Sequence, residues 1–418
     1  MVEKKMRAEN SDRISNLPDS LLVEILSWLD ASEAVLTCIL SKRWRSLWTF
    51  VPYLYFDFAD FGDDAEWFNN FVSSFLRLRD DATNVHTFTL RYSVPRDTDV
   101  DDLVNAWILY ALDHEVKNLE VDLFRKRCRH LPDCLFACAS LDSLHLNCYN
   151  HIEPHFVCLP KLRFLSLYGV FMPYDSMQKI ISGSPSLETL CMHRCAVVMM
   201  NSGISFHTVK SLTMEDCDLF SRSDVPTFDI SAPCLKYIKF VKGWGPSITF
   251  KDMSKLTEAV LIMAIDEEKD NDCYLLSGIL GVETLGIGSI RLKEFLTREL
   301  QNWRELKRLK FILLGVCCMH CDFGICAKLL KHCPNLERLC LMHTGELCRV
   351  DHSGEVKAEN LEEIGGSSCR NLKLIEIVWY RSHHNVQQLE QLMLHWTKNI
   401  GGVQIKVSEY MLKSLLPS

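Results

Sequence analysis

Long apolar segments are missing from this chain of 418 residues. The longest purely apolar run, around Val260 to Ile265, is far shorter than the ~20 residues needed to cross a bilayer. The N-terminal stretch MVEKKMRAENSDR is charged and lacks the apolar core of a secretion signal, and no Asn-x-Ser/Thr glycosylation site occurs. We therefore expect no membrane contact, and a cytoplasmic and/or nuclear location in which the 19 cysteines remain reduced.

The motifs of common enzyme classes are also missing. There is no G-x-x-x-x-G-K-Ser/Thr phosphate loop and no G-x-Ser-x-G nucleophile elbow, and Gly286 and Gly288 form a G-x-G only inside a predicted strand. The 15 histidines are scattered. The net charge of -8 argues against a protein that binds nucleic acid through phosphate contacts. The sequence favours a non-catalytic protein that needs no cofactor and binds neither nucleic acid nor membrane.

One cluster contains residue types that could bind a metal ion. The stretch CCMHCDFGICAKLLKHC offers close-spaced thiols and imidazoles, which are the ligands of tetrahedral zinc: Cys317, Cys318, His320, Cys321, Cys326, His332 and Cys333. It lacks two separated C-x-x-C pairs, however, and Cys333 has a position that recurs ahead of other repeats. We predict no metal site, and the sequence leaves open whether 317–333 binds zinc.

A repeated pattern occupies most of the chain. The pattern is apolar-x-x-apolar-x-apolar, and its copies start at Val85, Val116, Leu141, Leu162, Leu187, Val209, Leu235, Val282, Leu306, Leu336 and Leu372, with a degenerate copy at Leu256. From Val116 to Leu336, nine steps cover 220 residues, a mean near 24, which is typical of leucine-rich repeats. Each copy predicts a short strand, and helical segments follow several copies. The fold class predicted is an α/β repeat solenoid with a parallel sheet on its concave face.

Three regions are expected along the chain: 11–57, a helical module; 58–350, the repeat solenoid; and 351–418, a C-terminal cap. The segment 49–61 is aromatic and apolar and is interpreted as a junction, with a helix at 66–78 after it. The cap should consist of a strand at 372–380, a helix at 386–398 and a strand at 403–407, because a solenoid needs its last apolar unit covered.

The N-terminal module consists of short amphipathic helices. Apolar residues recur at three- and four-residue spacing from Leu21 to Leu29, and Asp30 with Glu33 resembles a capping box for a second helix. A third turn contains Trp44 and Trp48. About forty residues cannot bury so many Leu, Ile and Trp side chains among themselves. The surplus apolar face should therefore meet a partner protein.

These residues also resemble a known family. Leu17-Pro18-Asp19, the segment Leu40-Ser-Lys-Arg-Trp-Arg45 and Leu47-Trp48 are similar to the F-box of plant F-box proteins. In that family the F-box binds a Skp-type adaptor, which links it to a cullin-based ubiquitin ligase. The resemblance implies an adaptor-binding surface formed by Leu17, Pro18, Leu21, Leu22, Ile25, Leu26, Leu36, Leu40 and Trp44. The C-terminal region is similar to the FBD-type region of plant F-box proteins with leucine-rich repeats.

Strand residues that alternate with the buried positions should line the concave face. They change along the chain from acidic, through aromatic and His-rich, to basic. Aromatic residues and Arg are enriched where proteins bind each other. The residues predicted to contact a target protein are His145, Phe164, Tyr168, His193, Tyr237, Lys239, Arg308, Lys310 and Arg338.

The resemblance implies the substrate-recognition subunit of a Skp-cullin-F-box (SCF) ubiquitin ligase, a non-catalytic protein whose repeats bind an unknown protein substrate for ubiquitination. Two alternatives stay open. One is a protein-binding scaffold with a vestigial F-box that works without a ligase. The other is a small-molecule (hormone) co-receptor, although the sequence has no dense basic cluster for an inositol phosphate. An enzyme ranks last.

Overall fold

The computed structural model describes residues 14, 16–93, 101–123, 131–199, 203–221, 227–242, 247–263, 276–289, 306–316, 328–343, 371–380, 394 and 402–410. The chain divides into two compact units, which are described one at a time. The first comprises Met1–Phe171 with Lys179–Ser186, and the second comprises Met172–Gln178 with Leu187–Ser418. The predicted cap helix at 386–398 lies, except for Leu394, outside the described residues.

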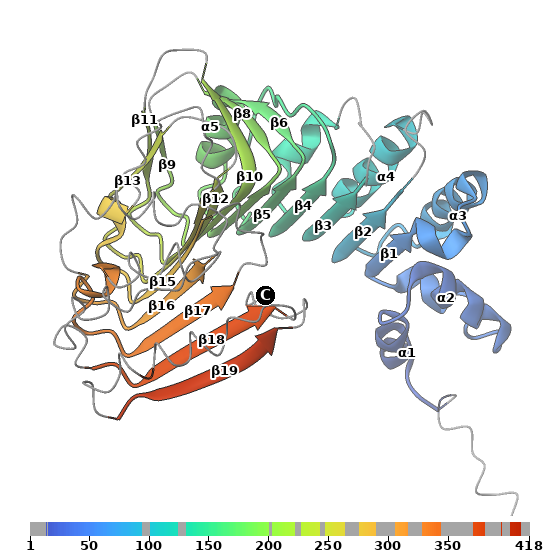
Figure 1. The fold of residues 1–418 in the computed structure, drawn as a ribbon. Helices are drawn as coiled ribbons and strands as arrows, with labels where there is room; N and C mark the ends of the chain where they lie inside the picture. Colours follow the sequence, from blue (N-terminus) through green and yellow to red (C-terminus); the bar gives the residue numbers. More distant parts are fainter. Residues whose placement is uncertain are drawn as a thin grey trace, which may run out of the picture. The chain divides into compact units, whose positions relative to one another are not determined.

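The helical module opens the first unit (Figure 1). It contains α1 (Asp19–Leu26), α2 (Ala31–Leu36) and two short 3-10 segments, η2 (Thr37–Ile39) and η3 (Leu47–Phe50). Asp30 caps α2 as predicted, because its carboxylate accepts a hydrogen bond from the Glu33 backbone N–H at 2.7 Å. The predicted third helical turn is a series of turns and η3 rather than an α-helix. It brings Trp44 and Trp48 into the core of the unit.

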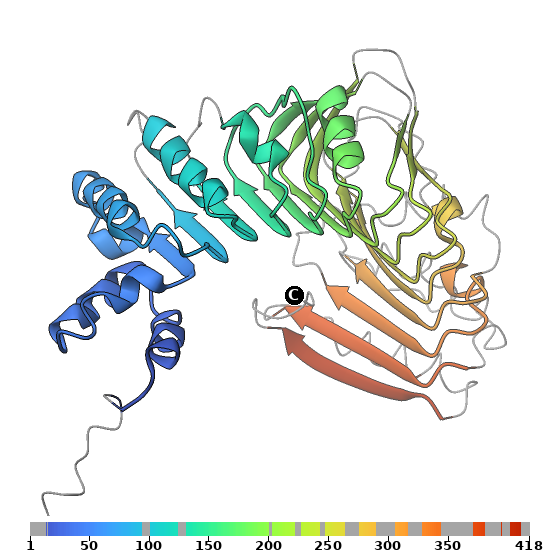
Figure 2. The ribbon, with the colours of Figure 1, turned by 180° about the vertical axis from the view of Figure 1, so that it is seen from behind.

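Five parallel strands follow in chain order within the first unit (Figures 1 and 2). They are β1 (Tyr53–Asp57), β2 (Thr87–Arg91), β3 (Asn118–Asp122), β4 (Ser143–Asn147) and β5 (Phe164–Tyr168). The connecting elements include η4 (Phe58–Phe61), α3 (Ala65–Leu78), α4 (Asp101–Asp113) and η5 (Asp133–Ala137). Burial alternates along β3 and β4, so that one face of each strand packs in the core.

The first strand corrects the interpretation of 49–61 as a junction. β1 pairs with β2 in parallel, with Tyr53 opposite Thr87, and so begins the sheet. Its segment Val51-Pro-Tyr-Leu54-Tyr-Phe56 has the spacing of the repeat, and Val51, Leu54 and Phe56 are buried. The interpretation missed this copy because aromatic residues and Pro52 hide the leucine pattern.

The second unit continues the pattern with nine parallel strands of one sheet. They are β7 (Thr189–His193), β10 (Ser211–Ser221), β12 (Tyr237–Lys242), β14 (Glu258–Met263), β15 (Thr284–Ser289), β16 (Phe311–Val316), β17 (Arg338–His343), β18 (Leu374–Tyr380) and β19 (Gln404–Tyr410). β18 and β19 correspond to the two strands expected in the cap, and they pair in parallel. The α/β repeat solenoid is thus confirmed.

Strands replace several of the helices expected between repeats in the second unit. β9 (Gly203–Ser205), β11 (Thr227–Ser231) and β13 (Ser247–Lys251) form a separate parallel sheet, and β8 (Ala196–Met199) pairs with the end of β10. The segment Thr-Phe-Asp-Ile-Ser of β11 alternates buried and half-buried residues, a period of two that suits a strand. The remaining elements are β6 (Phe171–Pro173), α5 (Tyr174–Gly183) and η6 (Leu276–Ile279).

One predicted repeat has the wrong register. The sequence places a copy at Leu306, but β16 begins at Phe311, opposite Thr284 of β15 and Arg338 of β17. The copy therefore starts at Leu309, with Ile312 and Leu314 as its buried strand positions. Leu306 and Leu309 are both fully buried (0% exposed), so the apolar spacing alone fits either register.

A buried arginine joins the helical module to the first repeats. Arg79, at the C-terminal end of α3, is 3% exposed. Its guanidinium donates to the carbonyl oxygens of Val51 at 3.0 Å, Thr83 at 2.7 Å and Asn84 at 3.1 Å. Val51 follows η3, whereas Thr83 and Asn84 precede β2, so one side chain ties together three backbone segments. The five N–H groups of a guanidinium suit this role better than an ammonium.

Replacing Arg79 should destabilise the first unit. Arg79→Met removes the donors of three carbonyl oxygens, of which that of Val51 is buried, and a buried unsatisfied acceptor costs about 1–3 kcal/mol. We expect the free energy of unfolding, measured by denaturant titration, to fall by roughly 1–3 kcal/mol. Arg77→Met on the same helix is the matched control, because Arg77 is exposed. Equal stability of the two variants would refute the role of Arg79.

Candidate functional site

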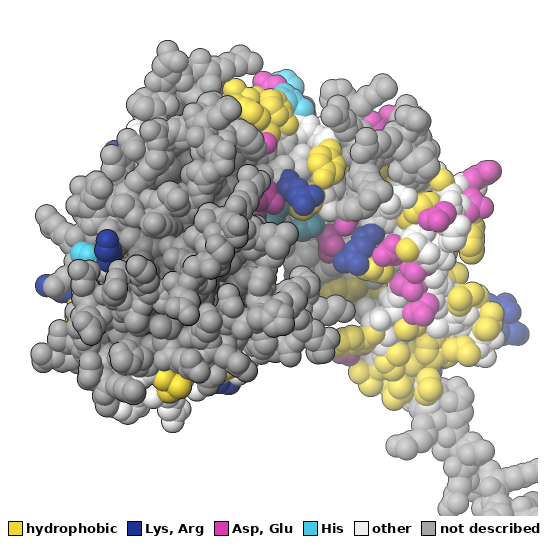
Figure 3. All heavy atoms as spheres, viewed as in Figure 1, with side chains coloured by type: hydrophobic (Ala, Val, Ile, Leu, Met, Phe, Trp, Pro, Cys, Tyr) yellow, Lys and Arg dark blue, Asp and Glu magenta, His cyan; other side chains and the backbone are white. Residues whose placement is uncertain are grey.

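The helical module exposes an unusual amount of apolar surface. Trp28 is 87% exposed and Ile39 is 81% exposed. Together with four neighbours they form what we call the apolar patch: Leu21, Ile25, Trp28, Leu36, Ile39 and Leu40. Figure 3 shows hydrophobic side chains gathered at the lower right, over the α1–α2 part of the chain. Contiguous exposed apolar surface of this kind marks a protein-binding site.

Helix geometry separates this patch from the core of the module. On α1, Leu22 and Leu26 are fully buried (0% exposed), whereas Leu21 and Ile25 are 43% and 45% exposed. Residues four apart share one helix face, so the two pairs point in different directions. The predicted adaptor surface is therefore corrected at three positions: Leu22, Leu26 and Trp44 are buried and belong to the interior.

The other predicted adaptor positions lie at or near the surface. Leu36 and Leu40 are 62% and 63% exposed, Pro18 is exposed as the residue before α1, and Leu17 is half-buried. The sequence missed Trp28 and Ile39, the two most exposed members of the patch. The available signal was the helical spacing itself, because Trp28 lies three residues after Ile25 and Ile39 lies three residues after Leu36.

An ion pair holds the start of α1 against the turn that precedes η3. Arg43 Nε lies 2.7 Å from Asp19 Oδ1, and an Arg43 Nη2 also donates to the carbonyl oxygen of Leu17. The pair is partly exposed, so it contributes little stability by itself. It fixes the Leu17-Pro18 entry to α1 beside the apolar patch.

The strands present a second surface, the inner face, formed by residues that alternate with the buried ones. In the first unit its members are Tyr55, Asp57, Arg91, Glu120, Asp122, His145, Asn147, Phe164 and Tyr168. The predicted target-binding residues His145 and Tyr168 are half-buried there, and Phe164 is 36% exposed. Parallel register places Asn147 opposite Tyr168.

Hydrogen bonds connect the polar members of this inner face. Arg91 Nη1 donates to the Tyr55 hydroxyl at 2.9 Å, and Arg91 Nη2 lies 3.2 Å from Glu120 Oε1. The Tyr55 hydroxyl in turn donates to Asp57 Oδ2 at 3.0 Å. Burial, only partly offset by a hydrogen bond from Asn147, raises the pKa of the Asp122 carboxyl. The single cation of the network is therefore shared among several acceptors.

In the second unit the inner face brings together His193, Glu215 and Lys239, from three adjacent strands. Lys239 Nζ lies 2.5 Å from Glu215 Oε1, and His193 Nδ1 lies 3.5 Å from Glu215 Oε2. Lys239 is buried, at 9% exposed, which leaves its stem unavailable to a large partner. Burial is also the main cause that raises the pKa of Tyr237 beside it.

The basic residues predicted at one end of the inner face form ion pairs with glutamates. Arg308 Nη2 and Lys310 Nζ lie 3.1 and 2.9 Å from the two carboxylate oxygens of Glu283, and both residues precede β16 because of the register correction. Arg338 binds the Glu376 carboxylate and lies over the Phe311 ring, 4.9 Å from its centroid. The three predicted cations are thus paired with two glutamates within the second unit, and Arg308 and Lys310 share the carboxylate of Glu283.

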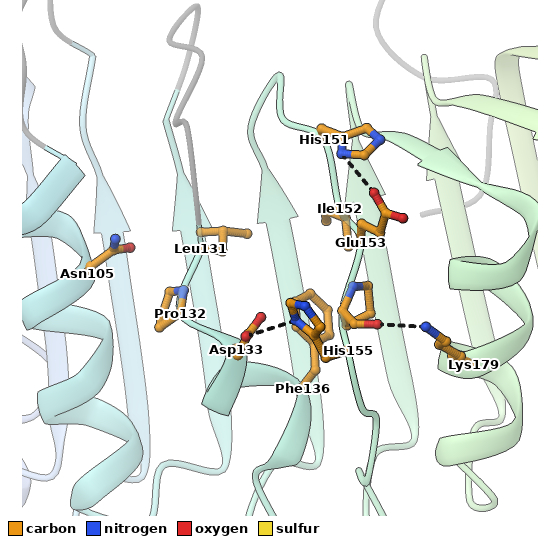
Figure 4. A pocket seen from close by; sticks show the side chains of 11 residues that line it. Asn105, Leu131, Pro132, Asp133, Phe136, His151, Ile152, Glu153, His155 and Lys179 are labelled. Carbon is orange, nitrogen blue, oxygen red and sulfur yellow. Dashed lines mark hydrogen bonds and ion pairs between the residues drawn. The ribbon is translucent and has the colours of Figure 1, made fainter.

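A polar cavity of about 740 Å³ lies in the first unit between α4 and the Lys179 end of α5 (Figure 4). Phe136 and Ile152 are its buried lining residues. Its charged groups are paired locally: His155 Nδ1 with Asp133 Oδ2 at 3.2 Å, His151 Nδ1 with Glu153 Oε2 at 3.8 Å, and Lys179 Nζ with the Pro154 carbonyl oxygen at 3.2 Å. We assign no ligand to this cavity.

The Cys/His cluster falls mainly on 317–327, outside the described residues. Of its members, His332 and Cys333 are described, and the Cys333 thiol is buried and donates to the Leu329 carbonyl oxygen at 3.4 Å. Within the described ranges no group of three or more His, Cys, Asp or Glu side chains could hold a metal ion.

Another cysteine of the second unit, Cys217, lies in the core. A hydrogen bond with Cys195, together with burial, raises the pKa of the Cys217 thiol, which suits a core position.

A helical module with an exposed apolar patch, followed by leucine-rich repeats, defines a class of two-surface binding proteins. The F-box domain model matches residues 14–54. The model described as "At1g61320/AtMIF1, LRR domain" matches residues 79–411. No helix in the described part of the chain is long and apolar enough to cross a membrane.

Relatives from Arabidopsis thaliana agree with these matches. An F-box/FBD/LRR-repeat protein is 30% identical over 66% of this chain and 65% of its own length. A second F-box/FBD/LRR-repeat protein is 27% identical over 96% of this chain and 99% of its own length. A putative F-box/LRR-repeat protein is 31% identical over 86% of this chain and 70% of its own length.

The chain therefore belongs to the plant F-box proteins with leucine-rich repeats. F-box domains of this family generally bind Skp-type adaptors, and the repeats generally bind substrates. Members are typical substrate adaptors of SCF ligases and are generally non-catalytic. The ubiquitin pathway is implied by the F-box itself.

The Glu283 pairs predict a pH dependence. Lys310 first, then Arg308, hold the pKa of Glu283 below its ordinary value. Because the folded-state pKa is lowered, the contribution of these pairs is present above the ordinary carboxyl pKa and is lost as the pH falls through the lowered value. Lys310→Met should raise the pKa of Glu283, measured by NMR titration of carbon-13-labelled glutamate.

Lys331→Met is the control for this titration, since it removes an exposed ammonium elsewhere in the second unit. It should leave the Glu283 titration unchanged. A Glu283 pKa that stays the same in Lys310→Met would show that the ammonium does not act on this carboxylate in solution.

Proposed function

We propose that this protein is the substrate-recognition subunit of an SCF-type ubiquitin ligase. Its helical module binds a Skp-type adaptor, and through it a cullin, while the inner face of the repeats binds a target protein for ubiquitination. The observation that supports this most directly is the apolar patch, in which Trp28 and Ile39 are more than four-fifths exposed. Side chains of this size are normally buried in a fold or in a complex.

The energetics of the patch suit a stable complex. Burying an exposed Leu or Ile side chain contributes roughly 1.5–3 kcal/mol, and a Trp at the centre of an interface contributes at the upper end or beyond. Six such residues together contribute roughly 9–18 kcal/mol, which is comparable with the free-energy cost of association, estimated at about 4–15 kcal/mol. The patch can therefore offset most of that cost.

The protein itself performs no bond chemistry in this proposal. It holds the target beside a ubiquitin-charged enzyme and thereby raises the effective concentration of the target's lysines. We place this activity in the cytoplasm or nucleus, where the cysteines stay reduced.

The first test is co-purification of the full chain with a plant Skp-type adaptor and cullin. Trp28→Ala/Leu40→Ala removes two exposed members of the apolar patch. We expect the wild type to retain both partners and the double variant to bind the adaptor about 100-fold more weakly, measured by titration calorimetry.

A matched control comes from α3. Trp67→Ala/Leu78→Ala removes the same residue types at positions that are 55% and 60% exposed, outside the apolar patch. This control should bind the adaptor as the wild type does. A folded wild type that binds no adaptor would overturn the ligase proposal and favour the scaffold with a vestigial F-box.

A further inference from the structure

The inner face of the first unit carries more negative than positive charge. Among the described residues of this face, the carboxylates are Asp57, Glu120 and Asp122, and the guanidinium is that of Arg91. Arg91 is already bound to Glu120 and to the Tyr55 hydroxyl. This face therefore differs from that of the second unit, where Arg308, Lys310 and Arg338 outnumber the two glutamates that they pair with.

Negative charge continues from this face toward the helical module. Burial first, then the carboxylates of Asp30, Asp57 and Glu33, raise the pKa of Asp60. Each of these neighbours acts in the same direction, so like charges lie near one another in the folded chain. Figure 3 shows acidic side chains beside the hydrophobic ones of the apolar patch. A cation brought by a partner would relieve this repulsion.

The same face has more hydrogen-bond acceptors than donors. Within the described part of the chain, Asp122 Oδ1 and Asn147 Oδ1 are buried and accept no hydrogen bond. The two residues lie opposite each other on β3 and β4. These two oxygens are enclosed, so a donor brought by a partner would meet the accessible carboxylates of this face instead, such as Glu120, whose side chain is 34% exposed.

Aromatic residues also lie on or next to these strands. Tyr53 of β1 is 43% exposed, Phe164 of β5 is 36% exposed, and Tyr149, which follows β4, is 39% exposed. The Arg91 guanidinium lies 5.3 Å from the centre of the Tyr55 ring, which is the geometry of a cation–π contact. The face thus already accommodates one guanidinium between a ring and a carboxylate. A planar guanidinium uses both kinds of contact, whereas an ammonium uses chiefly the charge.

We propose that the inner face of the first unit binds an arginine-bearing, basic segment of the target protein. The inference rests on the proposed function, because it names the chemical class of the substrate that the repeats would recognise. Arginine side chains of the target would lie between the exposed rings and donate to Asp57, Glu120 and Asp122. Neutral and acidic segments would lack both the charge and the donors.

The test uses the full chain purified with its Skp-type adaptor and three fluorescein-labelled nonapeptides, made of arginine, lysine or glutamate alone. Fluorescence anisotropy at about 150 mM salt gives the affinities, since surface charge effects beyond a contact pair are largely screened there. We expect the arginine peptide to bind, the lysine peptide to bind several-fold more weakly and the glutamate peptide not to bind.

Two variants with the same change of net charge locate the site. Asp57→Asn/Glu120→Gln/Asp122→Asn neutralises the inner face with side chains of similar shape. Glu66→Gln/Asp81→Asn/Asp113→Asn neutralises three exposed acids of the first unit outside the inner face. The first variant should bind the arginine peptide about tenfold or more weakly, and the second should bind it like the wild type.

The outcomes separate this inference from the proposed function. Equal losses in both variants, or no preference for arginine over lysine and glutamate, would overturn the inference even if adaptor binding is intact. Arginine binding that depends on the inner face would support the inference. If the chain fails to bind the adaptor, the peptides would be titrated against the chain alone, and the same result would still support the inference. Adaptor binding by the inner-face variant should match the wild type, because none of its three positions lies in the apolar patch.

Discussion

Each repeat can bury its apolar strand residues only together with the strands beside it, and the rest of the structure depends on this stacking. Leu144 and Leu146 of β4 are fully buried (0% exposed) because β3 and β5 pair with the strand in register on its two sides. The residues between them must then face the other way. A single constraint therefore builds the core and also aligns His145 with Glu120 and Ser166 in rows across the inner face.

The sequence predicted this architecture because a period near 24 residues is visible wherever leucine or valine fills the buried positions. It failed where several apolar residues fit two registers, as at Leu306 and Leu309, both of which are fully buried (0% exposed). Only pairing with β15 and β17 selects Leu309 as the start of that copy. It also failed at β1, where Pro52, Tyr53 and Tyr55 fill the positions between the buried residues and obscure the pattern. Local spacing gives the period, and contacts between strands give the phase.

The sequence predicted the two candidate surfaces less completely than it predicted the repeats. Family resemblance identified the helical module, but a motif lists positions in order and does not say which face of the folded module each occupies. Leu21 and Leu22 are adjacent in the motif, yet one is 43% exposed and the other is fully buried (0% exposed). Alternation along the strands did place the inner-face residues correctly for most copies. It could not show that Arg338 is paired with Glu376, since that contact joins residues 38 positions apart.

The apolar patch and the inner face of the first unit belong to the same unit, and Arg79 ties together the backbone segments that lie between them. Arg79 binds the Val51 carbonyl at the end of the module and the Thr83 and Asn84 carbonyls before β2. Because the Arg79 guanidinium is buried, water cannot replace these carbonyl partners. A rotation of the module against the first strands would therefore break several charge-assisted hydrogen bonds at once. If the protein acts as the substrate receptor proposed above, these bonds favour one arrangement of the apolar patch and the inner face of the first unit. A target bound on that unit would then present its lysines to the ubiquitin-charged enzyme within a limited volume.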